Sequence, residues 1–150
     1  MAQSVPPTLG LVLAGGLARR MGGGDKALIE IGGRTILDRV LQTMTPQCER
    51  IILNANGDLS RFARFGLSVV PDDIPDFAGP LAGILAGLDW AATHRPEIEW
   101  MVSVPGDCPF LPSDLVATRA GPRRPTPVGS LSLPDGFLLS FRPVRATMPL

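Results

Sequence analysis

Apolar residues in this chain fall either into short continuous runs or into stretches with helical spacing. Four continuous runs predict buried strands, at residues 9–14, 50–53, 67–70 and 99–104. Helical spacing predicts one helix over residues 36–44, closed by Pro46, and another from Leu81 to about His94. Because strands alternate with helices, we expect an α/β fold, a Rossmann-like three-layer sandwich with a mostly parallel sheet.

Local patterns give three finer expectations about the helices. Residues 60–65 predict a short helix between the second and third strands. Ser113 is expected to cap a last helix that begins at Asp114. The helix that starts at Leu81 should bury the side formed by its apolar residues, which are Leu81, Ile84, Leu85, Leu88 and Ala92.

Polar or glycine residues follow each predicted strand. A glycine loop comes after the first strand, Asn54 after the second, Asp72 after the third and Asp107 after the fourth. The carboxyl ends of parallel strands meet at one edge of a sheet, where α/β proteins bind ligands. The sequence therefore predicts a ligand crevice at this edge.

The loop after the first strand combines glycines with positive charge. Bare backbone N–H groups and fixed cations after a buried strand are typical of a phosphate site, whereas the alternative is a solvated surface turn. A Walker A loop is excluded, because Asp25 precedes Lys26 and Ala27 follows it. The string from Gly22 to Ala27 fits G-x-G-x-x-[GA] but lies too far beyond the strand for a dinucleotide fingerprint. The residues concerned are Gly15, Gly16, Arg19, Arg20, Gly22, Gly23, Gly24 and Lys26.

Two charged residues are candidates for chemistry on phosphates. Asp107 lies between a buried strand and two prolines, so its carboxylate suits magnesium shared with a triphosphate; the alternative is a helix cap. Lys26 suits stabilisation of negative charge on phosphates, and its alternative is a solvated loop lysine.

Three further positions are candidates for contacts with the base or ribose. Asn54 offers a donor and an acceptor, although it also fits a turn. Asp72 can accept hydrogen bonds from the N1 and N2 groups of guanine, but the neighbouring Asp73 leaves the choice open. Residues 79–83 place a helix start where a base or ribose can pack against bare backbone, or form an ordinary Gly-Pro helix start.

Composition narrows the class of protein. The chain has 150 residues, zero formal net charge and 45% hydrophobic residues, which fits one globular domain with a flexible start at residues 1–8. Neither a nucleic acid nor a membrane is indicated as a partner, and the start lacks the pattern of a signal peptide. The two isolated cysteines indicate reduced thiols of a cytoplasmic protein. The single histidine argues against a His-rich zinc site.

The longest pattern in the chain resembles a known family. Residues 13–26 read L-A-G-G-x-x-R-R-M-G-G-x-D-K, and similar agreement continues at N-A-N (54–56), at Asp72, at G-P-L-A-G (79–83) and at D-C-P-F-L-P (107–112). Over roughly residues 9–119 the chain resembles the molybdenum cofactor guanylyltransferases, which have a nucleotidyltransferase-type fold. The resemblance implies transfer of GMP from GTP to molybdopterin, or its molybdenum form, with release of pyrophosphate and with Mg²⁺ as cofactor.

The resemblance also implies roles for residues and partners. It selects Asp72 over Asp73 and suggests catalytic roles for Lys26, Asp107 and Arg20, with Asp107 as metal ligand. Molybdoenzyme chaperones or other cofactor-biosynthesis proteins are further implied partners. GTP-binding residues would be Leu13, Ala14, Gly15, Gly16, Lys26, Asn54, Asp72, Gly79, Pro80, Leu81 and Asp107.

Residues 121–150 depart from the family pattern. They contain six prolines and no helical period, although residues 131–141 predict a hairpin across Pro134-Asp135-Gly136. The His-Pro and Asn-Thr-Pro segments that hold the pterin in the family are absent, as after a shifted reading frame or a truncation. We expect the nucleotide half to be independent of this tail. The alternatives are therefore a GTP-binding remnant or interaction module, or a related cytidylyl or sugar-phosphate nucleotidyltransferase.

Overall fold

The computed structural model describes residues 5–14, 25–74, 80–119 and 137–140. In these parts of the chain, the main sheet has five strands in the order β5-β4-β1-β6-β7. Strands β5, β4, β1 and β6 are parallel, and β7 is antiparallel to β6. The strands are β1 (Thr8–Leu13), β4 (Arg50–Asn54), β5 (Ser68–Val70), β6 (Trp100–Pro105) and β7 (Phe137–Ser140). All four strands predicted from apolar runs are confirmed to within one or two residues at their ends.

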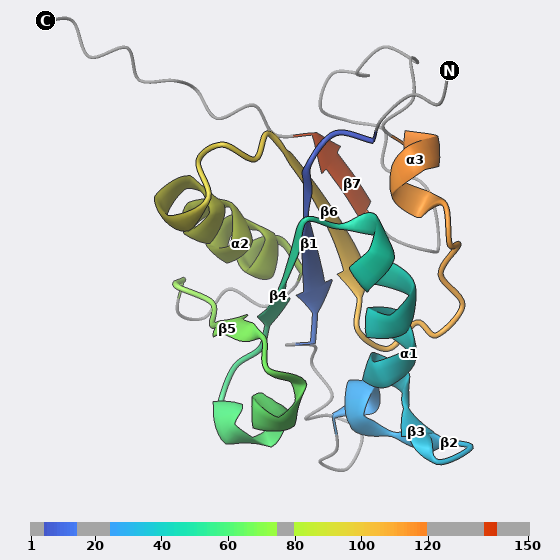
Figure 1. The fold of residues 1–150 in the computed structure, drawn as a ribbon. Helices are drawn as coiled ribbons and strands as arrows, with labels where there is room; N and C mark the ends of the chain where they lie inside the picture. The colour runs from blue at the N-terminus through green and yellow to red at the C-terminus, as the bar shows by residue number, and fades with distance from the viewer. Residues whose placement is uncertain (1–4, 15–24, 75–79, 120–136, 141–150) are drawn as a thin grey trace, which may run out of the picture.

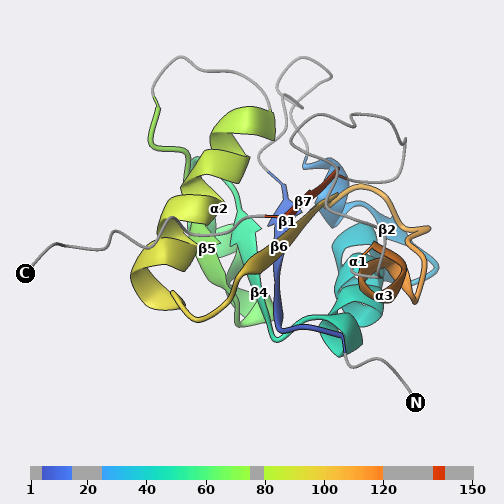
Figure 2. The same cartoon turned by 90° about the horizontal axis from the view of Figure 1, so that it is seen from above.

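Helices cover both faces of the sheet, which gives three layers (Figures 1 and 2). Helix α2 (Pro80–His94) packs on one face, and α1 (Ile36–Met44) and α3 (Leu115–Arg119) lie on the other. The expected α/β three-layer sandwich is therefore confirmed. The remaining elements are the short helices η2 (Lys26–Leu28), η3 (Thr45–Gln47) and η4 (Leu59–Phe65) and the hairpin β2 (Glu30–Ile31) with β3 (Arg34–Thr35). Element η4 confirms the short helix expected at 60–65, in the 3-10 form.

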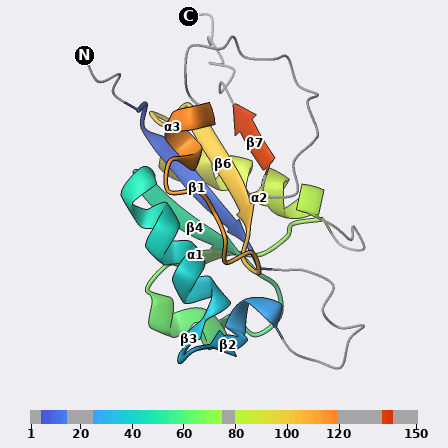
Figure 3. The ribbon, with the colours of Figure 1, turned by 90° about the vertical axis from the view of Figure 1, so that its right-hand side faces the viewer.

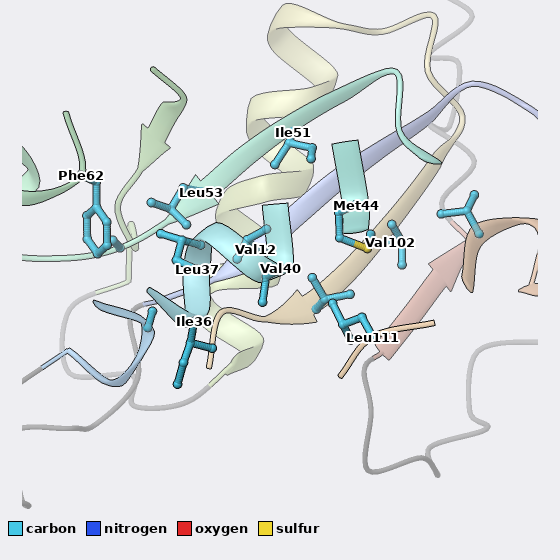
Figure 4. Close-up of a cluster of buried hydrophobic side chains, with 14 residues drawn as sticks. Val12, Ile36, Leu37, Val40, Met44, Ile51, Leu53, Phe62, Val102 and Leu111 are labelled. Carbon is cyan, nitrogen blue, oxygen red and sulfur yellow. The ribbon is translucent and has the colours of Figure 1, made fainter. Parts of the chain in front are cut away.

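A separate hydrophobic cluster fills each side of the sheet. Side chains alternate along β1, so that Leu9 and Leu11 join the cluster under α2 while Val12 joins the cluster under α1. The α1 side also holds Val40, Met44, Leu53 and Val102 among other fully buried residues (Figure 4). Burial on both faces explains why β1 reads as a continuous apolar run.

The expected apolar face of α2 is only partly right, because Ile84 is buried and Leu88 packs against the core while the other three residues are exposed. Leu81 and Leu85 are 53% and 41% exposed, and Ala92 is exposed as well. The helix approaches the sheet so closely that a Cβ on Gly87 would lie 2.8 Å from Leu11 Cδ2. Large side chains of the sheet thus fill the space between the sheet and α2. The buried face of the helix consists mostly of small residues, which are Ala82, Gly83, Ile84, Ala86, Gly87 and Ala91.

The start of α1 is fixed by a reciprocal capping box. The Thr35 hydroxyl accepts a hydrogen bond from the Asp38 amide at 3.0 Å, and the Asp38 carboxylate accepts one from the Thr35 amide at 3.0 Å. Arg64 of η4 also donates to Asp38, at 3.0 Å. Hydrogen bonds lower the pKa of Asp38 to about 2, and the bond from Arg64 has a larger effect than the one from Thr35. The carboxylate therefore ties η4 to the first turn of α1.

Helix α3 begins at Leu115 rather than at the expected Asp114. The first-turn amide of Val116 donates to Gln47 Oε1 at 3.0 Å, and Gln47 Nε2 donates to the Pro112 carbonyl at 3.0 Å. Ser113 was predicted to cap this helix. Instead, the side chain of Gln47, which lies in η3 and is distant in sequence, forms hydrogen bonds with the backbone at the start of α3.

Part of the atypical tail belongs to the sheet. Residues 137–140 pair with β6 in the register Phe137↔Ser103 to Ser140↔Trp100. The rest of the predicted 131–141 hairpin lies outside the described residues. Because β7 covers the edge of β6, part of the tail contributes to the fold, whereas the independence of nucleotide binding from the tail stays a prediction. Among the described helices, none combines the length and the apolar character needed to cross a membrane.

Removing β7 should destabilise the sheet edge. We expect a chain ending at residue 120 to unfold at lower urea concentration and to associate as its concentration rises, because β6 then presents unpaired backbone groups. A chain ending at residue 140 keeps β7 and should stay monodisperse by size-exclusion chromatography with light scattering. Equal stability of the two truncated chains would contradict a structural role for β7.

Candidate nucleotide-binding site

The carboxyl ends of the central strands lie at one level. Leu13 of β1 pairs with Asn54 of β4 on one side and with Pro105 of β6 on the other (Figure 3). The Ala14 amide donates to the Asn54 carbonyl and the Gly106 amide donates to the Leu13 carbonyl, both at 2.8 Å. The chain leaves β1 toward β4 and later returns to β6 on the other side of β1, so the topological switch point lies here.

Two asparagine side chains hold the carboxylate of Asp72. Asn54 Nδ2 donates to Asp72 Oδ1 at 2.8 Å, and Asn56 Nδ2 donates to Asp72 Oδ2 at 2.9 Å. The Asp72 amide in turn donates to Asn56 Oδ1 at 2.8 Å. Both carboxylate oxygens thus have a fixed partner within the protein, and the half-buried Asp72 side chain has a defined orientation.

Asn54 is itself held from three directions. Its Nδ2 group also donates to the Val70 carbonyl at 3.0 Å, so both amide hydrogens are used within the protein. Its Oδ1 atom lies against Gly83 of α2, where a Cβ would be only 2.3 Å away. Asn54 is 4% exposed. The side chain therefore supports Asp72, and a direct contact of Asn54 with a ligand stays a prediction.

The first turn of α2 lies over the same edge. Pro80 is the first residue of the helix, and Gly83 packs against Asn54 and the Leu13 side chain. Pro80 and Leu81 are exposed. The first turn of α2, with the positive end of the helix dipole, therefore lies beside Asn54, the residue that bonds Asp72.

Lys26 lies in η2, beyond the carboxyl ends of the strands. Its side chain is exposed, whereas the following Ala27 is buried among α1-side residues and anchors the turn. The preceding Asp25 forms a two-point ion pair with Arg61 of η4, with Nε to Oδ2 at 2.5 Å and Nη2 to Oδ1 at 3.3 Å. The backbone that carries Lys26 is thus fixed on both sides.

Asp107 follows β6 and is exposed. The preceding Gly106 is packed tightly, since a Cβ there would lie 3.2 Å from the Leu13 carbonyl oxygen. On the other side, buried Leu111 and the bond from Gln47 to Pro112 hold the segment. A rigid backbone therefore presents the Asp107 carboxylate to solvent at the sheet edge.

The structure brings together only part of the expected site. Leu13, Ala14, Asn54 and Asp72 lie in one bonded group, while Lys26 and Asp107 stand at the same edge as exposed charges. The residues outside the described ranges are Gly15, Gly16, Arg19, Arg20 and Gly79. Sequence reasoning overlooked Asn56 and Arg61. The N-A-N pattern contains a signal for Asn56, because alternate residues at the end of a strand can point the same way and contact the same residue, here Asp72.

Other reactive side chains take no part in this edge. Burial raises the pKa of the Cys48 thiol to about 12, and its sulfur packs where a Cβ on Gly10 would lie 2.9 Å away. His94 is an exposed residue at the end of α2 and stacks on Trp90 with ring centroids 4.6 Å apart. Within the described ranges, no group of three or more His, Cys, Asp or Glu side chains is arranged to hold a metal.

A sequence model of one protein family, described as the MobA-like NTP transferase domain, matches residues 10–128. The chain belongs to that family. Its match spans the sheet edge from Leu13 to Asp107 and therefore includes every residue of the candidate site.

Two similar proteins carry the same name. A molybdenum cofactor guanylyltransferase of Nitrobacter hamburgensis is 66% identical over 116 residues, which cover 77% of this chain and 56% of that protein. One from Bradyrhizobium sp. strain ORS 278 is 68% identical over 108 residues, covering 72% and 51%. The chain thus spans about half the length of the curated relatives it matches.

A solved structure supports the fold. The crystal structure of a homologue of Mycobacterium tuberculosis Rv0371c, from Mycobacterium sp. strain JC1, superposes with a TM-score of 0.61 at 27% identity. It covers 75% of this chain and 57% of its own. The three-layer MobA-like architecture of this chain therefore has a direct structural parallel.

The contact between Gly83 and Asn54 can be tested by adding one methyl group. Gly83→Ala should lower the free energy of unfolding by about 1–3 kcal/mol, because the new Cβ would overlap Asn54 and the site must shift. Urea unfolding measures this, and a double-mutant cycle with Asn54→Ala should show favourable coupling. Asp89→Ala, at an exposed position of α2, is the control and should change stability by roughly 0.5 kcal/mol at most. A neutral or stabilising Gly83→Ala would contradict the close approach.

Proposed function

We propose that this protein transfers GMP from GTP to molybdopterin and releases pyrophosphate, giving the guanine dinucleotide form of the cofactor. The observation that carries the proposal is the Asp72 carboxylate, held by Asn54 and Asn56 at the switch point of the sheet. Relatives at 66% and 68% identity are named molybdenum cofactor guanylyltransferases, which supports the same conclusion.

Asp72 would select guanine. Guanine presents two neighbouring donors, N1–H and the N2 amino group, which match the two oxygens of one carboxylate. Adenine lacks this pair of donors, so it would forgo both charge-assisted hydrogen bonds and would turn its N1 acceptor toward the carboxylate. The start of α2, at Pro80 and Leu81, would pack against the base or the ribose.

Lys26 would balance the negative charge of the triphosphate. In the transfer, a terminal phosphate oxygen of molybdopterin attacks the α-phosphorus of GTP, and the bond from this phosphorus to the bridging oxygen of the β-phosphate breaks. Pyrophosphate leaves, and no covalent enzyme intermediate forms. The protein contributes position and charge, through Lys26, the main chain at Leu13 and Ala14, and Arg20 of the glycine loop.

The exposed Asp107 fits a magnesium site. Magnesium commonly takes one or two protein carboxylates and completes its shell with phosphate oxygens and water, so one rigidly held carboxylate suffices. When bound, the ion would neutralise charge on the phosphates and hold them in position. Asp107 would be the protein ligand for it.

A second candidate is a GTP-binding module that does not complete the transfer. The observation that favours it is the sequence of residues 121–150, which lacks the His-Pro and Asn-Thr-Pro segments expected for binding the pterin. Formation of the dinucleotide cofactor from GTP and molybdopterin separates the two candidates, because the module would bind GTP without giving product. Use of CTP or a sugar phosphate, a cytoplasmic location and contacts with molybdoenzyme chaperones stay predictions.

Nucleotide preference tests the assignment of Asp72. With magnesium present, calorimetry should detect GTP binding, with ATP and CTP bound at least about 10-fold more weakly because their bases cannot donate two hydrogen bonds to the Asp72 carboxylate. Asp72→Asn should remove much of this preference, since one carboxylate oxygen becomes a donor. Equal affinity of the wild-type protein for all three nucleotides would refute the guanine assignment.

Lys26 and Asp107 should respond differently to magnesium. Lys26→Ala should weaken triphosphate binding by about 10-fold or more at every magnesium concentration, because the lost charge belongs to the protein. Asp107→Asn should chiefly shift the magnesium dependence of GTP binding to higher concentration. Controls are Arg50→Ala, at the opposite end of β4, and Asp89→Asn on α2, both exposed. An unchanged magnesium dependence in Asp107→Asn would leave Asp107 without a metal role.

A further inference from the structure

We infer that Asn56 is a positioning residue that sets the guanine specificity of this site by fixing the plane of the Asp72 carboxylate. The inference deepens the proposed function and rests on it, since it concerns the same reading of the base. Asn56 acts through Asp72 and not through a contact of its own with the nucleotide.

Asn56 and Asp72 close a ring of two hydrogen bonds. Asn56 Nδ2 donates to Asp72 Oδ2 at 2.9 Å, while Asn56 Oδ1 accepts from the Asp72 amide at 2.8 Å. The first bond holds the end of the Asp72 side chain and the second holds its backbone. The terminal torsion of an aspartate is otherwise soft, because rotation about its sp³–sp² bond has a broad minimum. Asn56 therefore restricts this rotation at Oδ2 and at the same time fixes the backbone from which the side chain extends.

Asn54 alone would restrain the carboxylate less. It bonds only Asp72 Oδ1, and its own position is fixed by the Val70 carbonyl and by Gly83. Rotation about the Cβ–Cγ bond moves both oxygens, so a hydrogen bond to each of them holds the plane more firmly than a bond to one. Each oxygen keeps lone-pair capacity after accepting one bond, so a fixed plane can receive two further donors side by side.

The consequence is a graded effect on three purine nucleotides. GTP offers both the N1–H and the N2 amino donor, ITP offers only N1–H, and ATP offers neither donor of this pair. Loss of a fixed carboxylate plane should therefore weaken GTP most and ITP less, and it should leave ATP unchanged. A general loss of structure would weaken all three nucleotides alike, through their common ribose and triphosphate.

The test compares Asn56→Ala and Asn56→Asp with the wild-type full chain, by calorimetry with GTP, ITP and ATP in the presence of magnesium. Asn56→Ala removes both bonds. Asn56→Asp keeps an acceptor for the Asp72 amide but replaces the donor by a carboxylate that repels Asp72. We expect a loss of GTP affinity of about 10-fold in either variant, a smaller loss for ITP and no change for ATP. Asp73→Ala, a truncation at the exposed neighbouring residue, should leave all three affinities unchanged.

Two results would overturn the inference, and only one of them would also overturn the proposed guanine specificity. If the wild-type protein prefers GTP but the variants change all three nucleotides equally, or none, Asn56 has no role in specificity and the proposed function stands. If the wild-type protein binds GTP, ITP and ATP alike, the guanine assignment falls together with the inference. If Asn56→Ala does not fold, Asn56→Asp gives the decision, since it retains the bond to the Asp72 backbone.

Discussion

The register of β1 between its two neighbours is the constraint on which the rest of the structure depends. Leu13 lies opposite Asn54 on one side and Pro105 on the other, so three strands end at one level. A slip of one residue would exchange the side chains that face α1 with those that face α2. Both faces of β1 are buried, and such a slip would disrupt two hydrophobic clusters at once. The packing of the core therefore brings the polar residues after β4 and β6 to one edge.

The close approach of α2 links this core to the site. Gly87 allows the helix to rest on Leu11, and one turn earlier Gly83 allows it to rest on Asn54. A Cβ at either position would push the helix away from the sheet. The same small-residue face that packs the core thus presses on the side chain that supports Asp72. Stability of the α2 layer and the geometry of the candidate site are consequently coupled through two glycines.

The sequence predicted the strands, the main helices and the sheet edge, because each depends on local periodicity and on the direction of parallel strands. It was right for only two residues of the predicted α2 face, Ile84 and Leu88, since large apolar residues are expected toward the core, whereas here the sheet supplies most of the large side chains. It also failed for bonds between distant segments. Gln47 meets Val116 across 69 positions, and Arg61 meets Asp25 across 36. Asn54 and Asp72 were placed at one edge by topology, but their direct bond, and the role of Asn56, needed side-chain geometry.

The two sides of the proposed site are built differently, and the difference fits what each would have to recognise. On the base side, Asn54, Asn56 and Asp72 already use one another as partners, so their order is established on folding and a base would meet a fixed acceptor pair. On the phosphate side, Lys26 and Asp107 stay in contact with water, because burying either charge without a partner would be strongly unfavourable. A triphosphate and a metal would supply the missing partners on binding. The hydrogen bonds described on the base side join residues between Asn54 and Asp72, and the packing contact with Asn54 comes from Gly83, so one short stretch of the chain forms this part of the proposed site.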